Sequence, residues 1–163
     1  NMEGPFTILG QLVPSKQIYK GVYRQPKKLR ELCEQVGNQL VRYALEAERH
    51  GVDMLSYADP TVAAELISPK LYTELCGEIS WEVLKAIEGA TEKIVLHLCN
   101  KTSVAFQQAR FCTLERLPVQ EGKSYGEDLL EAIERPEVRC LGHGCIQRTY
   151  CPAGRCIYKL NLK

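Results

Sequence analysis

Apolar and polar positions along this chain follow two different spacings, which predicts a series of strands and helices. Short apolar runs are typical of buried strands, whereas apolar residues recurring at three- and four-residue steps are typical of amphipathic helices. We therefore expect strands at residues 6–13, 52–58, 93–99, 111–119, 138–146 and 157–162. We expect helices at residues 26–50, 68–89, 102–110 and 125–135, with a polar loop before the first of them.

Proline and glycine mark the ends of the two longest predicted helices. Pro26 stands at the start of the first, and Gly51 follows its last apolar residue. Ser68 and Pro69 form an N-cap and a first-turn proline for the second, which ends at Gly89. Proline is favoured in the first helical turn and glycine just after the last, so these boundaries agree with the apolar spacing.

The alternation of strand and helix predicts an α/β fold with parallel strands. Short strand–helix–strand links form right-handed parallel crossovers, and helices then cover the sheet. A closed barrel of eight such units commonly needs about 250 residues, and this chain has 163. We therefore expect a single domain, 1–163, that forms a partial (β/α) barrel and is completed by dimerisation, as a homodimer, or by another partner.

Charge and hydropathy narrow the classes of partner. The 21 basic and 20 acidic residues nearly balance, which disfavours binding to nucleic acid or to an anionic membrane surface. No apolar stretch approaches the roughly 20 residues of a membrane helix, and no signal peptide precedes the first strand. We expect a cytoplasmic protein.

Polar residues that could carry chemistry gather at the predicted strand ends. Asp59 follows the second strand, His97 and Cys99 close the third, and His143 and Cys145 close the fifth. Ligands bind at the carboxyl ends of strands in parallel α/β folds, because loops and helix N-termini meet there. Asp59 is either a polar residue that caps its loop or a carboxylate that orients a substrate or a metal-bound histidine.

The spacing of His97 and Cys99 predicts a metal site. Residues two apart on a strand point to the same face, so both could bind one ion. Cys145, in the glycine-rich run 142–145, is the leading third ligand, because glycine lets the backbone turn sharply. One histidine and two thiolates form a known catalytic zinc set with a fourth position open. A local alternative is a structural zinc knuckle, whose ligands would come from Cys140, His143, Cys145, Cys151 and Cys156.

Three segments resemble a known family. They are GPFTILGQLV at 4–13, GVDMLSYADPTVAAELISPKLYTEL at 51–75 and KIVLHLCN at 93–100. Together they are similar to the uroporphyrinogen decarboxylase superfamily, and the His-x-Cys pair is closer to its cobalamin-dependent branch, the methylcobamide:coenzyme M methyltransferases. The resemblance runs from residue 4 to about 147, and it lacks the N-terminal part of the family's barrel.

The resemblance implies a TIM barrel with zinc held by His97, Cys99 and Cys145, and it likens Asp59 to an acidic residue of the substrate cleft. The interval before Cys145 is shorter than the family's, so Cys140 stays an alternative third ligand. The implied reaction moves a methyl group from a methyl-corrinoid (cobalamin), presented by a corrinoid protein, to a small thiol. A truncated, inactive relative that serves in binding or assembly is the alternative, as is a uroporphyrinogen decarboxylase-like enzyme.

Overall fold

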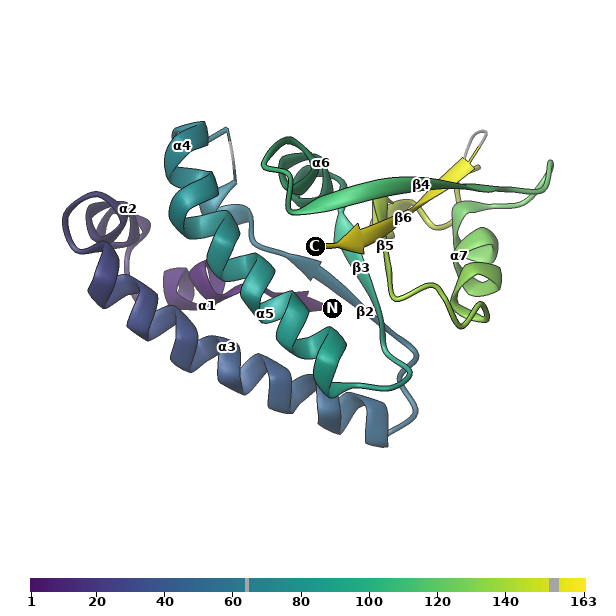
Figure 1. Ribbon diagram of the computed structural model, residues 1–163, viewed down its shortest axis with the longest axis horizontal. Coiled ribbons are helices and arrows are strands. Elements are labelled where there is room, and N and C mark those ends of the chain that lie inside the picture. The colour runs from purple at the N-terminus through teal and green to yellow at the C-terminus, as the bar shows by residue number, and fades with distance from the viewer. Residues whose placement is uncertain (64, 153–155) are drawn as a thin grey trace.

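An open, six-stranded sheet forms the centre of the molecule (Figure 1). The computed structural model describes residues 1–63, 65–152 and 156–163. The strands are β1 (Met2–Glu3), β2 (Met54–Ala58), β3 (Val95–Cys99), β4 (Cys112–Pro118), β5 (Cys140–Gly144) and β6 (Cys156–Leu162). They lie in the order β1-β2-β3-β5-β6-β4. This arrangement confirms the α/β class and the incomplete barrel, because the sheet does not close.

Helices account for most of the remaining chain. They are α1 (Pro5–Leu12), α2 (Ser15–Arg24), α3 (Pro26–Arg49), α4 (Pro69–Leu71), α5 (Gly77–Ala90), α6 (Asn100–Gln108) and α7 (Tyr125–Ile133). A π-helical turn, Tyr72–Cys76, joins α4 to α5. The long predicted helices are thus confirmed, and Ser68 caps α4 by accepting a hydrogen bond from the Leu71 amide at 3.3 Å. No helix in the described part of the chain is both long and apolar enough to cross a membrane.

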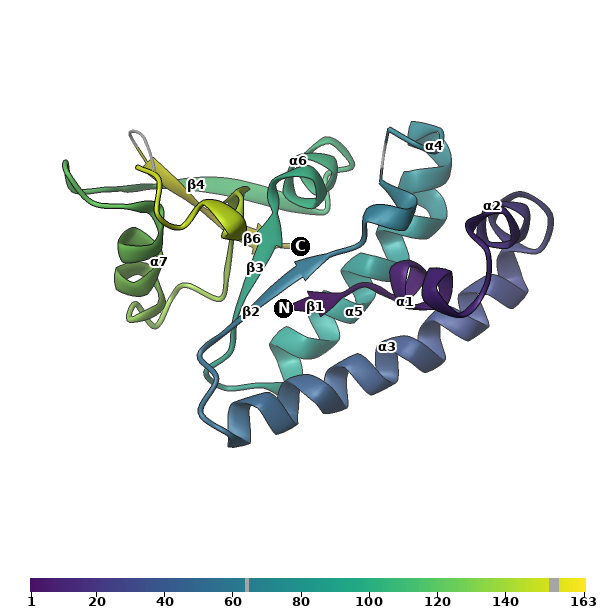
Figure 2. The same cartoon turned by 180° about the vertical axis from the view of Figure 1, so that it is seen from behind.

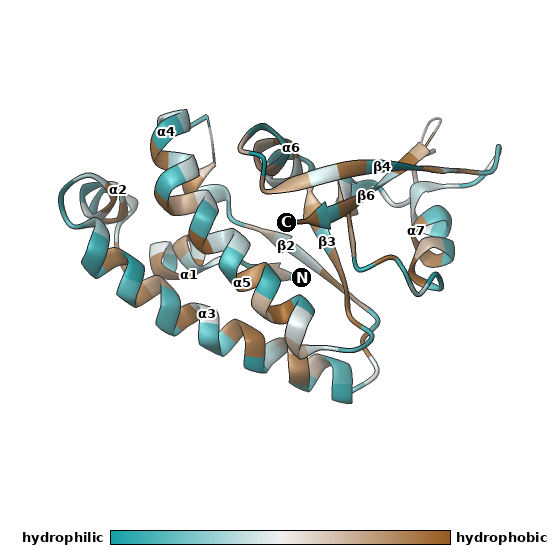
Figure 3. Cartoon of the chain, in the orientation of Figure 1, coloured by the Kyte–Doolittle hydropathy of each residue, from teal (hydrophilic) through white to brown (hydrophobic). Residues whose placement is uncertain are grey.

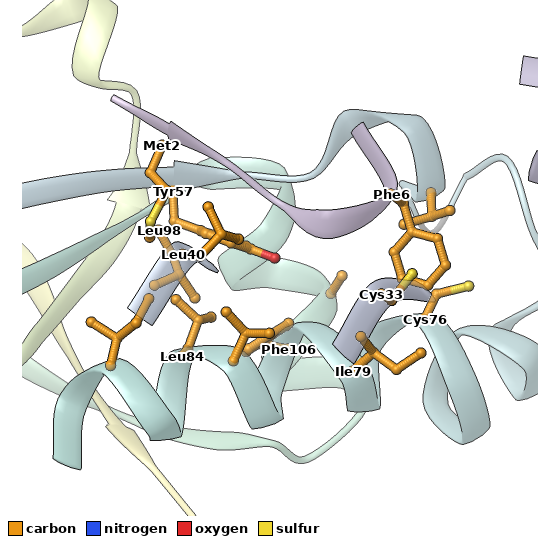
Figure 4. Close-up of a cluster of buried hydrophobic side chains, with 14 of the residues drawn as sticks. Met2, Phe6, Cys33, Leu40, Tyr57, Cys76, Ile79, Leu84, Leu98 and Phe106 are labelled. Carbon is orange, nitrogen blue, oxygen red and sulfur yellow. The ribbon is translucent and has the colours of Figure 1, made fainter. Parts of the chain in front are cut away.

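Two layers of helix flank strand β3. Helices α3 and α5 lie side by side against one face (Figures 1 and 2), and apolar and polar residues are interspersed along α3 (Figure 3). Leu96 and Leu98 belong to this larger core. Figure 4 shows Leu98 near Tyr57, Leu40 and Leu84, with Phe6 at the other end of the core beside Cys33 and Cys76. Successive strand side chains point to opposite faces, and Val95 accordingly packs into a smaller core under α7.

The first predicted strand is wrong. Residues Pro5–Leu12 form helix α1, and the only strand pairing here is made by Met2–Glu3, just before it. Pro5 occupies the first helical turn, and the side chain of Asp59 accepts hydrogen bonds from the amides of Phe6 and Thr7. Periodicity cannot separate a short apolar helix from a buried strand. The hydrogen bonds from this first turn to Asp59, a residue distant in the sequence, favour the helix.

The expected polar loop before α3 is also wrong. Residues Ser15–Arg24 form helix α2, which buries Ile18 and Val22 on one face. These residues are four apart, which is the spacing of one helical stripe. Two apolar residues among polar neighbours gave too weak a signal for a helix.

One strand departs from the expected parallel arrangement. Strands β1, β2, β3 and β5 pair in parallel, whereas β6 runs antiparallel to β5 and to β4. A parallel return commonly needs a crossover helix. In the described residues between β5 and β6 there is only the 3-10 turn Ile146–Arg148, so β6 folds back beside β5.

Candidate functional site

The predicted site residues lie at one edge of the sheet. Strands β2, β3 and β5 are neighbours and run in parallel. Asp59 directly follows β2, Cys99 ends β3, and Cys145 directly follows β5. Cys99 and Gly144 are paired residues of the β3–β5 ladder, so the His-x-Cys pair and the Gly-Cys turn stand on adjacent strand ends.

A bulge in β5 brings the chain to Cys145. His97 pairs with Leu141 and Cys99 with Gly144, so two steps along β3 match three along β5. The extra step includes His143, whose φ of 59° is left-handed, and its amide donates to the Ser103 hydroxyl at 2.9 Å. Bulges re-aim the chain next to functional sites. The expectation that the neighbouring glycines make the sharp turn is therefore wrong: His143 itself takes the left-handed conformation, and Gly142 and Gly144 instead allow close packing against Leu160 and Tyr125.

His97 is completely buried and neutral. Its Nε2 atom lies 2.8 Å from the Tyr125 hydroxyl, and its Nδ1 atom lies 3.4 Å from the Ser56 hydroxyl. Burial lowers the pKa of His97 to about 4, because the charged imidazolium would lose its hydration. A neutral imidazole is the form that binds a metal ion.

The expectation that Cys99 shares a face with His97 is not met, because Cys99 lies where β3 gives way to helix α6 and lines a cavity with Tyr72 of the larger core, whereas His97 contacts Tyr125 of the smaller core. The Cys99 Sγ atom is 3.1 Å from the Thr102 hydroxyl, in the first turn of α6. It lines a small cavity of about 40 Å³ whose wall also includes Asp59 and Tyr72. Asp59 and Cys99 therefore share one internal space.

Cys145 lines a larger, open cavity of about 590 Å³. Lys101, His143 and Arg148 also face this cavity, and none of its lining residues within the described part of the chain is acidic. The remaining lining residues are Asn100, Tyr125, Gly142, Gly144, Cys151, Pro152, Cys156, Ile157 and Tyr158. The cavity thus combines thiols with basic side chains beside the strand ends.

Cys140 occupies a different place from Cys145. It begins β5, pairs with Leu96 and is fully buried in the larger core. Burial raises the pKa of its thiol well above the usual range, which keeps it protonated. This placement favours Cys145 over Cys140 as a partner for His97, and it separates Cys140 from the other residues of the alternative knuckle.

Asp59 is engaged by the first turn of α1. Its Oδ1 atom accepts from the Thr7 amide at 2.8 Å and the Thr7 hydroxyl at 2.6 Å, and its Oδ2 atom accepts from the Phe6 amide at 3.2 Å. Burial raises the pKa of Asp59 to about 6, although these hydrogen bonds oppose the rise. The carboxylate therefore orients α1 at the cavity shared with Cys99.

Tyr125 is a site residue that the sequence pattern did not single out. It stands at the first position of α7, is 7% exposed, and its ring meets that of His97 edge to face at a centroid distance of 6.0 Å. Nothing in the spacing connects residue 125 to residue 97, and only the packing of α7 over β3 brings them together.

The three predicted ligands are residue types that zinc commonly binds. His97, Cys99 and Cys145 supply one neutral imidazole and two thiols from adjacent strand ends. Their side chains do not yet converge. In the part of the chain that the structure describes, no three His, Cys, Asp or Glu residues gather closely enough to hold a metal ion. Binding by all three would therefore need side-chain rearrangement.

Comparison with known proteins gives a family and two relatives. The sequence profile of the uroporphyrinogen decarboxylase (URO-D) family matches residues 1–135. The chain is 25% identical over 120 residues to "Methylcobamide:CoM methyltransferase MtaA" of Methanosarcina barkeri (strain Fusaro / DSM 804) and 24% identical over 120 residues to a protein of the same name from Methanosarcina barkeri. Each match covers 74% of this chain and 34% of the relative. The matched part spans about a third of those proteins, and no solved structure gives a significant match.

Proposed function

This chain belongs to the uroporphyrinogen decarboxylase family, and we propose that it takes part in moving a methyl group from a methyl-corrinoid to a small thiol. The similarity to the two methylcobamide:CoM methyltransferases supports a methyltransferase-like role. The observation that carries the proposal is the pairing of Cys99 with Gly144, which sets His97, Cys99 and Cys145 on neighbouring strand ends.

In this proposal His97, Cys99 and Cys145 hold a zinc ion. Zinc, when bound, would act as a Lewis acid that stabilises the acceptor thiol as its thiolate, the nucleophilic form. The buried imidazole of His97 stays neutral across the physiological pH range, so it offers a lone pair without first losing a proton. Cys99 and Cys145, each half-buried, would bind as thiolates.

The rest of the site positions the reactants. The open cavity of about 590 Å³ beside Cys145 gives the thiol a route to the strand ends, and a separate corrinoid protein would present the methyl group there. Asp59 acts through helix α1, because both of its carboxylate oxygens bind the amides or hydroxyl of that helix. It would thereby maintain the wall of the cavity that it shares with Cys99.

Metal analysis of purified protein tests the ligand set. We expect about one zinc per chain, lost in His97→Ala and in Cys99→Ser while the far-ultraviolet circular dichroism spectrum stays unchanged. Cys151→Ser and Cys156→Ser are matched controls, because both thiols line the same cavity as Cys145 but lie outside the proposed set. If zinc is lost only in those two variants, the metal is bound by a structural knuckle and not by the proposed ligands.

Methyl transfer is measured with methylcobalamin and 2-mercaptoethanol, by following the absorbance of the corrinoid and the thioether product. The expected result is a zinc-dependent rate that His97→Ala abolishes. A rate equal to that without protein, from zinc-loaded material, would reject the transferase role for this chain.

The open sheet supports a second candidate, a binding or assembly role. Among the described strands, β1 and β4 each pair on one side only, and unpaired edges are commonly covered by another chain. We propose that a second copy, or another partner, completes the barrel. Sedimentation velocity should show a dimer, and a compact monomer at high concentration would contradict self-association.

A further inference from the structure

Tyr125 stands between two of the proposed ligands. Its hydroxyl is 2.8 Å from Nε2 of His97 on β3. On its other side the phenol packs directly on the backbone of Gly144 on β5, so that a methyl group at Gly144 would overlap the hydroxyl and the ring. The ring thus fills the space between His97 and the Gly144–Cys145 turn.

The backbone around Tyr125 holds the ring in this place. The Tyr125 amide donates to the Cys151 carbonyl at 2.7 Å, and the Gly126 amide donates to the Thr149 carbonyl at 2.7 Å. The Ser124–Glu127 capping box fixes the same turn of α7. The first turn of α7 is therefore tied to the segment that follows Cys145, and the phenol is anchored at the site.

The nitrogen that Tyr125 contacts lies on the β5 side of His97. Strand β3 lies between β2 and β5. Nδ1 of His97 lies 3.4 Å from Ser56 on β2, whereas Nε2 points to the phenol that packs on β5. A metal ion shared by His97 and Cys145 must bind on the β5 side, where Nε2 is already hydrogen-bonded.

From these contacts we infer that Tyr125 is a positioning residue that competes with the metal ion for Nε2 of His97. This inference rests on the proposed ligand set and adds a condition to it: metal loading displaces the phenol from between β3 and β5. The hydroxyl holds the imidazole in the metal-free protein, and the anchored turn of α7 returns the ring when the metal leaves.

Zinc titration of two variants tests the inference, with a chromophoric chelator as competitor. Tyr125→Phe keeps the ring but removes the hydroxyl, and we expect zinc to bind about three- to tenfold more tightly, the loss of one hydrogen bond. Gly144→Ala adds a methyl group where the Tyr125 ring now packs, and so should displace the ring without changing any proposed ligand. We expect this variant also to bind zinc more tightly than the wild type. Tyr158→Phe is the matched control, because Tyr158 lines the same cavity but packs on His143, and its affinity should equal that of the wild type.

Two readouts do not depend on activity. In metal-free protein, Tyr125→Phe should shift the ¹⁵N resonance of His97 Nε2, and zinc added to the wild type should give a tyrosine difference spectrum that Tyr125→Phe lacks. Affinity that is unchanged or weaker in Tyr125→Phe, with zinc still lost in His97→Ala, would overturn the competition and leave the ligand set standing. If no folded variant binds zinc, the competition and the ligand set both fail.

Discussion

The carboxylate of Asp59 and the hydroxyl of Thr7, 52 positions apart in the chain, form a hydrogen bond of 2.6 Å inside the protein. The Thr7 amide donates to the same oxygen at 2.8 Å, and the Thr7 hydroxyl also accepts from the Thr61 amide at 3.2 Å. This contact fastens the start of α1 to the end of β2, and it explains why an apolar segment that resembles a strand is helical.

Removing the Thr7 hydroxyl should loosen this connection. We expect Thr7→Val, which keeps the shape of the side chain, to lower the free energy of unfolding by about 1–3 kcal/mol, because it removes one of the two hydrogen bonds to Oδ1 of the buried Asp59 carboxylate and takes from the Thr61 amide the hydroxyl to which it donates. Thr7→Ser restores a hydroxyl and should retain most of the stability. Urea denaturation of the three proteins measures the difference, and equal stability of Thr7→Val and the wild type would show that the contact contributes nothing.

Stability should depend on pH through Asp59. The pKa of this carboxyl is raised from 3.8 to about 6 on folding by burial, so the folded state binds a proton more readily than the unfolded state. Its contribution is therefore greatest below pH 3.8 and is lost as the pH rises towards 6. The quantity to compare is the free energy of unfolding of the wild type minus that of Asp59→Asn. We expect this difference to be larger at pH 4 than at pH 7, by up to about 3 kcal/mol.

Denaturation of both proteins at the two pH values checks this sign. Other titrating groups are common to both chains and cancel in the comparison. A difference that stays constant or grows as the pH rises would mean that Asp59 has an ordinary or lowered pKa in the folded protein.

Arg139 should be important for stability, although it lies far from the candidate site. Its guanidinium donates to the carbonyls of Glu88 at 2.9 Å and Thr91 at 2.6 Å, and also to that of Glu92. These carbonyls lie at and just beyond the end of α5, where helical partners are lacking. We expect Arg139→Met to destabilise the protein by about 1.5–3 kcal/mol.

Arg42→Met is the matched control for Arg139→Met, because Arg42 is exposed on α3. Its change in melting temperature should be small, within the equivalent of about 0.5 kcal/mol. Equal melting temperatures for the two variants would show that the hydrogen bonds of Arg139 do not stabilise the protein.

Replacing Gly37 and Gly89 by alanine should change the stability of the protein in opposite directions. A methyl group at Gly37 on α3 would lie 2.7 Å from Cγ2 of Val83 on α5, whereas one at Gly89 would meet nothing within 4 Å. We expect Gly37→Ala to cost about 1–3 kcal/mol through overpacking, and Gly89→Ala to add up to about 1 kcal/mol through helix propensity. Val83→Ala in the Gly37→Ala background should recover part of the loss, and a recovery of zero would place the strain elsewhere.

Local patterns in the sequence were enough to predict the elements whose ends depend on near neighbours. Apolar spacing and capping residues depend on neighbours within one or two turns, so they predicted four elements correctly. These are the long helix after Pro26, the helix that Ser68 caps, and the strands that end in His97 and Cys99 and in Gly144. Repeated strand and helix units also predicted an α/β sheet with polar residues at its carboxyl edge, since parallel strands end at the same side.

Contacts between distant segments, by contrast, could not be predicted from local patterns and are visible only in the folded chain. The side chain of Asp59 accepts hydrogen bonds from the first turn of the helix at 5–12, and β6 folds back beside β5 because a short connection replaces a crossover helix. Tyr125 reaches His97 through the packing of α7, which no local period encodes. The physical reason is that hydrogen bonds and packing across 28 to 53 positions depend on where whole elements settle, whereas periodicity records only which face of each element is buried.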